Sequence, residues 1–207
     1  MKKGGLLMIA GSLLLLGLFV YPLWNIMLGA PQYPDPLGMN IHVNKLVGQE
    51  EFDLQNIDNL NHYIGMKKLP QEGEMWEFEV FPKVVIGMVI LGILIGLLGL
   101  LNVMGPGWFL FWFILMSTLG SLGVYDFNIW LTDYGSDLDP QASLKILAPD
   151  GSLMTYKPPL LGHKKILNFD AYSYPMTGAY ILFVSIFLSL IAFFVGRREW
   201  GRRKAKS

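Results

Sequence analysis

Four long apolar runs constrain the fold of this chain more than any other feature. They cover approximately residues 5–27, 84–104, 107–125 and 177–196, and their apolar side chains follow one another without regular polar interruptions. The hydrocarbon core of a bilayer is about 30 Å thick, and a helix needs about 20 apolar residues to cross it. The sequence therefore predicts an α-helical membrane protein with four transmembrane helices.

These runs set the predicted domain organisation. Residues 1–27, 84–104, 107–125 and 177–196 are the expected transmembrane helices, and residues 197–207 form a basic tail. The polar stretches 28–83 and 126–176 are both long enough to form a small structured unit, so we expect two outer loops with α/β structure.

The distribution of charge predicts an orientation. The net charge is zero, but Lys2 and Lys3 lie at one end, six basic residues follow the last apolar run, and Glu199 is the one acidic residue of 16 near either end. Basic residues flank spans on the cytoplasmic side. We expect a multi-pass protein of the bacterial inner membrane with both termini cytoplasmic and both loops periplasmic. A lipid-headgroup or nucleic-acid patch is the alternative interpretation of the basic tail.

The start of the chain also has the pattern of a secretory signal, with Lys2 and Lys3 ahead of an apolar run. Its candidate cleavage site ends at Ala30, and Pro31 follows directly, a position where proline blocks most signal peptidases. We therefore expect an uncleaved membrane anchor.

Several function classes find no support in the sequence. There is no cysteine, no nucleophile motif and no glycine-rich phosphate loop, and the loops lack the basic and aromatic pattern of nucleic-acid binding. The four apolar runs contain no ionisable residue, whereas transporters place such residues within their spans. We expect neither an enzyme nor a transporter, and no nucleic-acid partner.

Local patterns predict the elements of the loops. Residues 39–47 and 75–80 alternate as strands do, with Pro82 ending the second. Asp53 is a plausible N-cap for a helix with apolar residues at three- and four-residue steps, and Gly65 a plausible stop. In the second loop, residues 134–140 are rich in turn formers, a hairpin is expected around Pro149-Asp150-Gly151, and residues 156–162 are expected to be extended.

Histidine and methionine residues in the loops are candidate ligands for copper. His62 and Met66 lie four residues apart on the expected helix and would share a face, and Met39 and His42 lie near each other. Thioether and imidazole groups select copper, and Cu(I) prefers the softer sulfur. Candidates of lower rank are Met75, Met154, His163 and Met176. The alternative is that the methionines pack in an apolar core and that His62 is a capping or hydrogen-bonded residue.

Five segments resemble a family of small four-span bacterial membrane proteins found beside the copper-delivery lipoprotein and the maturation components of nitrous oxide reductase. They are APQYP at 30–34, LNHYIGM at 60–66, YGSDLDP at 134–140, YKPPLLG at 156–162 and NFDAYSYP at 168–175. The second is the most specific, and together they cover both loops. The chain departs from the family pattern at Ser136, where relatives often have histidine.

The resemblance implies an accessory role in copper supply or assembly for a periplasmic respiratory enzyme, with His62 and Met66 at the matching positions. The expected partners are then the bilayer and proteins of a respiratory or copper-assembly complex. The rival hypothesis is a structural subunit that holds a multi-subunit membrane complex together without a metal. An acidic stretch between residues 50 and 79 is expected to be a solvated face or to dock a basic partner.

Overall fold

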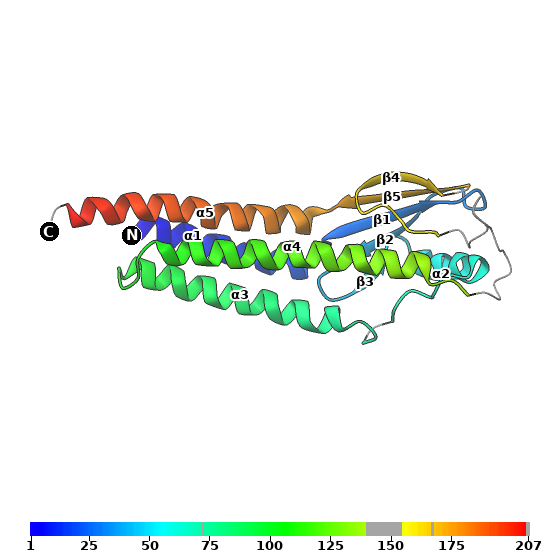
Figure 1. Ribbon diagram of the computed structural model, residues 1–207, viewed down its shortest axis with the longest axis horizontal. Helices are drawn as coiled ribbons and strands as arrows, with labels where there is room; N and C mark the ends of the chain where they lie inside the picture. Colours follow the sequence, from blue (N-terminus) through cyan, green and yellow to red (C-terminus); the bar gives the residue numbers. More distant parts are fainter. Residues whose placement is uncertain (72, 140–154, 167, 206–207) are drawn as a thin grey trace.

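The molecule is elongated, with a bundle of helices at one end and a β-sheet at the other (Figure 1). This computed structural model describes residues 1–71, 73–139, 155–166 and 168–205. Both ends of the described chain lie at the bundle end, far from the sheet (Figure 1). The hairpin expected around residues 149–151 lies outside the described residues.

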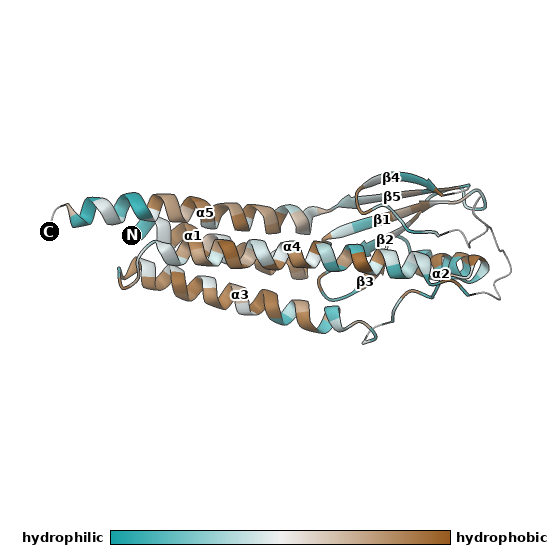
Figure 2. Cartoon of the chain, in the orientation of Figure 1, coloured by the Kyte–Doolittle hydropathy of each residue, from teal (hydrophilic) through white to brown (hydrophobic). Residues whose placement is uncertain are grey.

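Four helical segments in the described residues are long and apolar enough to cross a membrane. The first is α1 (Lys2–Leu14) continued by the 3₁₀ helix η1 (Leu15–Phe19), and the others are α3 (Trp76–Leu100), α4 (Gly107–Ser136) and α5 (Thr177–Lys204). Figure 2 shows that hydrophobic residues dominate their bundle portions. The prediction of a helical membrane protein is confirmed.

Helix α1 packs closely against α3 and α5 because glycines bring the backbones together. A methyl group on Gly5 would lie 2.6 Å from the carbonyl oxygen of Gly96, and one on Gly96 would lie 2.5 Å from Ile9 Cγ1. On the other side, Ser185 Oγ donates a hydrogen bond to the carbonyl oxygen of Gly11 at 2.6 Å. In lipid, helices associate through such close packing and hydrogen bonds. The glycines four residues apart at 92 and 96 therefore serve helix packing.

The first span is shorter than predicted. The helix was expected to continue to residue 27, but helical structure ends at Phe19, and residues 24–29 form strand β1 (Trp24–Gly29). This strand pairs on both sides, with β2 and with β5. Backbone pairing with segments far away in the sequence outweighs the local apolar pattern, which cannot distinguish a helix end from a buried strand.

The second and third spans are longer than predicted. The expected strand 75–80 is wrong: Trp76 starts α3, and the helix continues through Pro82. Glu77 and Glu79 lie in the first turn, where negative charge interacts favourably with the helix dipole. Helix α4 was expected to end at residue 125 but continues to Ser136, so most of the segment expected to form a turn at 134–140 is helical or follows the helix directly.

Segments from both predicted loops form one antiparallel sheet with the order β3-β2-β1-β5-β4. Strands β2 (Leu37–Ile41) and β3 (Leu46–Gly48) follow β1, while β4 (Gly162–Ile166) and β5 (Phe169–Pro175) precede α5. The expected strand 39–47 is thus divided by a turn, in which the His42 N–H donates to the Lys45 carbonyl oxygen at 2.9 Å. The two predicted loops are therefore a single folded unit.

The predicted helix is present as α2 (Asp53–Ile64), which Gly65 ends with φ +81° as expected, and it packs against this sheet. The predicted role of Asp53 as N-cap is wrong, because Phe52 occupies the cap position. Asp53 is buried in the first turn instead, and its Oδ2 accepts hydrogen bonds from the N–H groups of Gly38 at 2.9 Å and Glu50 at 3.0 Å. Its carboxylate joins the helix to β2 and is not part of a solvated acidic face.

Glu199 of α5 lies at the N-terminus of α1. Its carboxylate accepts hydrogen bonds from the N–H groups of Lys3 at 3.2 Å and Gly4 at 3.4 Å. We expect Glu199→Gln to lower the free energy of unfolding by about 0.5–1 kcal/mol, the usual value of a charge at an exposed helix terminus. Thermal unfolding in one detergent checks this result, and Glu51→Gln, at an exposed site on the sheet end, is the matched control. Equal midpoints for both variants would contradict the expectation.

Candidate functional site

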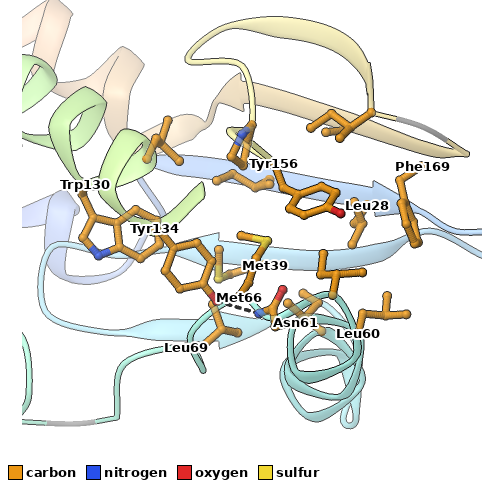
Figure 3. A pocket seen from close by; sticks show the side chains of 17 residues that line it. Leu28, Met39, Leu60, Asn61, Met66, Leu69, Trp130, Tyr134, Tyr156 and Phe169 are labelled. Carbon is orange, nitrogen blue, oxygen red and sulfur yellow. Dashed lines mark hydrogen bonds between the residues drawn. The ribbon is translucent and has the colours of Figure 1, made fainter. Parts of the chain in front are cut away.

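A pocket lies between the sheet, helix α2 and the last turns of α4. We call it the sheet pocket. Its volume is about 80 Å³, and its walls come from β1, β2, β4, β5, α2, α4 and the segment that includes Tyr156 and Pro158. Figure 3 shows the side chains that line it. Nearly all of the lining is apolar, so the pocket gives a low-dielectric environment beside the bundle.

Met39 and Met66 both line the sheet pocket. Met39 lies on β2 and is buried, and Met66 follows the end of α2 and is half-buried. The left-handed conformation of Gly65 turns the chain after α2, and the Met66 N–H donates to the Asn61 carbonyl oxygen at 2.8 Å. Both side chains are directed into the pocket in Figure 3. Two thioethers distant in the sequence therefore share one cavity.

The predicted shared face of His62 and Met66 is wrong. Because α2 ends at Ile64, Met66 lies beyond the helix, and the turn at Gly65 directs it to the pocket while His62 stays exposed on α2. His42 lies in the turn after β2 and does not line the pocket either. Burial and the charge of Lys45 lower the pKa of His42, so its imidazole is neutral near pH 7.

The candidates of lower rank are dispersed. Met75 precedes α3 and Met176 precedes α5, so both lie where a helix starts. His163 is exposed on β4, where its ring stacks on Tyr172 with centroids 4.5 Å apart and Nε2 lies 2.7 Å from Asp170 Oδ1. Met154 lies outside the described residues. None of the three described candidates lines the sheet pocket.

Two polar side chains of the sheet pocket, Asn61 and Tyr134, are hydrogen-bonded to each other. Asn61 Nδ2 donates to the hydroxyl oxygen of Tyr134 at 2.6 Å, and the Tyr134 ring stacks on Trp130 with centroids 4.9 Å apart. Burial raises the pKa of the Tyr156 hydroxyl, so this phenol is protonated at neutral pH. Among the described residues, no buried side-chain nitrogen or oxygen lacks a hydrogen-bond partner. The pocket therefore offers uncharged groups.

The chain around Met66 is held by the second polar stretch. The Asp139 N–H donates to the Gly65 carbonyl oxygen at 2.8 Å, and Lys67 forms an ion pair with Asp137. Asp58 Oδ1 accepts a hydrogen bond from the Leu69 N–H at 2.6 Å. The first two contacts come from residues at least 70 positions away in the sequence, so the first stretch alone does not determine the position of Met66.

Four of the five segments that carry the family resemblance meet at the sheet pocket. Segment 60–66 supplies Asn61 and Met66, segment 134–140 supplies Tyr134, segment 156–162 supplies Tyr156, and segment 168–175 supplies Phe169 among others. The aromatic and amide residues of the pocket were missed as site residues by sequence reasoning. Their occurrence in the segments that carry the family resemblance was the available signal. Ser136, the departure from the family pattern, is exposed at the end of α4.

The donor set determines which metal fits. Within the described ranges, no three His, Asp or Glu side chains come together as a group that could hold a metal ion. Hard divalent cations prefer such oxygen and nitrogen ligands, whereas thioethers bind Cu(I). A cavity of about 80 Å³ has room for one ion. The residues present therefore fit Cu(I) better than Ca²⁺ or Mg²⁺.

Comparisons of the sequence with protein-family models and with curated proteins found no significant match. The resemblance to the copper-assembly family therefore stays a prediction.

Proposed function

We propose that this chain is a membrane accessory protein in copper supply or assembly of a periplasmic respiratory enzyme of the nitrous oxide reductase type. The sheet pocket holds Cu(I) through the thioethers of Met39 and Met66. The observation that carries this proposal is that these two sulfur donors, from separate elements, line one pocket. Copper is the cargo in this function, and the protein needs to bind it reversibly.

The chemistry of the sheet pocket supports reversible binding. Two thioethers are neutral, so they hold Cu(I) without the charge of thiolates and release it more readily to a partner with stronger ligands. The absence of cysteine from the sequence avoids disulfide formation in an oxidising compartment. His62 lies outside the pocket on the exposed face of α2, where it is accessible to a partner during transfer. We assign it a secondary role in exchange.

A structural role without metal is the second candidate. It is favoured by the composition of the pocket, in which Met39 is surrounded by apolar side chains, as in an ordinary core. In this function the sheet links α1 with α5 and presents a surface to other subunits. The structural role predicts that Met39 and Met66 contribute to packing and do not bind a metal.

A methionine-to-leucine experiment separates these functions. Leucine keeps the volume and apolar character of methionine but has no sulfur donor, so Met39→Leu with Met66→Leu preserves packing to within about 1.5 kcal/mol. We expect this double variant to lose at least about tenfold in Cu(I) affinity, since even the loss of a group that only supports a metal ligand costs about 10–100-fold. Competition with a chromogenic Cu(I) chelator in detergent measures the affinity.

The matched control is the double variant Met8→Leu with Met88→Leu, because both residues are buried in the core of the bundle and neither lines the sheet pocket. It is expected to bind Cu(I) as the wild type does. A third variant, His62→Ala, is expected to keep the equilibrium affinity and to slow copper transfer to the chelator. Equal Cu(I) affinity of the wild type and the Met39, Met66 variant would overturn the copper site and leave the structural role.

A further inference from the structure

The bundle end of the molecule carries a dense group of positive charges. Helix α5 continues past the last apolar residues as a regular helix to Lys204, and Arg197, Arg198, Arg202 and Arg203 on this part are exposed. Lys2 and Lys3 lie at the start of α1 and are also exposed. The turn between α3 and α4, residues 101–106, contains no charged residue. We call residues 197–203, with Lys2 and Lys3, the cationic end.

The acidic residue of this end does not neutralise it. Glu199 directs its carboxylate to the N-terminus of α1, where it accepts hydrogen bonds from the backbone of Lys3 and Gly4. The partial positive charge of a helix N-terminus satisfies such a carboxylate. No described arginine of the cationic end forms an ion pair with Glu199. The guanidinium groups on the exposed side therefore remain available to an external anion.

The length of α5 places these groups at the level of lipid headgroups. Residues 177–196 contain no charge, and a helix of that length spans about 30 Å, the thickness of the hydrocarbon core. Arg197 and Arg198 then lie at its boundary, and residues 199–203 extend roughly another 7 Å, which is the depth of the headgroup region. Figure 2 shows this change from hydrophobic to hydrophilic residues along α5.

We propose that the cationic end binds the headgroups of anionic phospholipids. Arginine forms bidentate hydrogen bonds with phosphate oxygens, and a helical scaffold holds the guanidinium groups in place before the lipid binds. Basic residues next to a membrane attract anionic lipids by charge. The rigid continuation of α5 distinguishes this site from an unstructured basic tail that acts only as an orientation signal. The proposal does not depend on the copper site at the other end.

Lipid titration of the full-length chain tests the proposal. The purified protein in a neutral detergent is titrated with phosphatidylglycerol or phosphatidylcholine, and the midpoint of thermal unfolding is followed. We expect phosphatidylglycerol to raise the midpoint, with an apparent affinity at least about fivefold higher than that of phosphatidylcholine and weaker at high salt. Arg202→Gln with Arg203→Gln is expected to lower the phosphatidylglycerol affinity by about tenfold or more.

Two matched variants make the result specific. Lys164→Gln with Lys165→Gln removes two exposed charges from β4 at the sheet end and is expected to bind phosphatidylglycerol as the wild type does. Arg202→Lys with Arg203→Lys keeps the charge and is expected to retain most of the affinity. Wild-type phosphatidylglycerol affinity in the Arg202, Arg203 glutamine variant would overturn the proposal. An equal stabilisation by glycerol phosphate or by a short DNA duplex would also overturn it, because the anion recognised would not then be a lipid.

Discussion

Trp112→Ala is expected to lower the free energy of unfolding of the bundle by about 3 kcal/mol. The Trp112 side chain is fully buried between helices, and its Nε1 donates a hydrogen bond to the Met88 carbonyl oxygen at 3.0 Å. Removing a core tryptophan costs about 3–5 kcal/mol in soluble proteins, partly through the cavity that remains. We use the lower value because lipid is as apolar as a protein interior, so moving the indole from the core to lipid costs little. The loss then comes mainly from the packing contacts that Trp112 makes with its neighbours.

Thermal unfolding in one detergent measures this loss, with Trp108→Ala as the control on the same helix. Trp108 is 45% exposed, so its removal leaves no internal cavity and is expected to change the midpoint little. Trp112→Phe retains most of the volume and loses the indole donor, and it is expected to cost about 1 kcal/mol. Equal stability of the two alanine variants would show that Trp112 does not hold α3 and α4 together.

Asp53→Ala is expected to destabilise the sheet end by about 3 kcal/mol. One carboxylate oxygen, Oδ2, accepts hydrogen bonds from the backbone of Gly38 on β2 and of Glu50 before α2. Hydrogen bonds to a charged group contribute about 1.5–3 kcal/mol each, and alanine would leave the buried Gly38 donor without a partner. Because α2 covers the sheet pocket, the same change is expected to weaken Cu(I) binding.

The variant Asp53→Asn separates the contribution of the hydrogen bonds from that of the negative charge. Its amide oxygen can accept both hydrogen bonds but has no charge, so we expect about one third of the alanine effect. Glu51→Ala is the matched control, since Glu51 is exposed two residues earlier. Chemical denaturation, followed by near-ultraviolet circular dichroism, measures the free energy of unfolding of the sheet end. A loss for Asp53→Ala no larger than for Glu51→Ala would contradict the role of the carboxylate.

The helices of the bundle were predictable because the bilayer sets a length and an apolar composition that can be counted in the sequence. Helix α2 was also predictable, since its apolar steps and Gly65 are local signals. The helix ends near the sheet were not. Helical structure ends at Phe19 and strand β1 starts at Trp24, where a helix was expected, and at Trp76 an expected strand is helical. Neither local pattern contains information about the segments with which these residues pack.

The candidate site, too, was predictable from the sequence only in part. Met39, Met66, His62 and His42 were identified from residue type and spacing, and the structure brings the two methionines into one pocket and leaves the two histidines outside it. The sequence by itself determined the four apolar helices and the supply of soft donors. Only the tertiary structure decided which donors share a cavity, because residues at least 70 positions away hold the chain beside Met66 and the shared sheet pairs residues more than 100 positions apart.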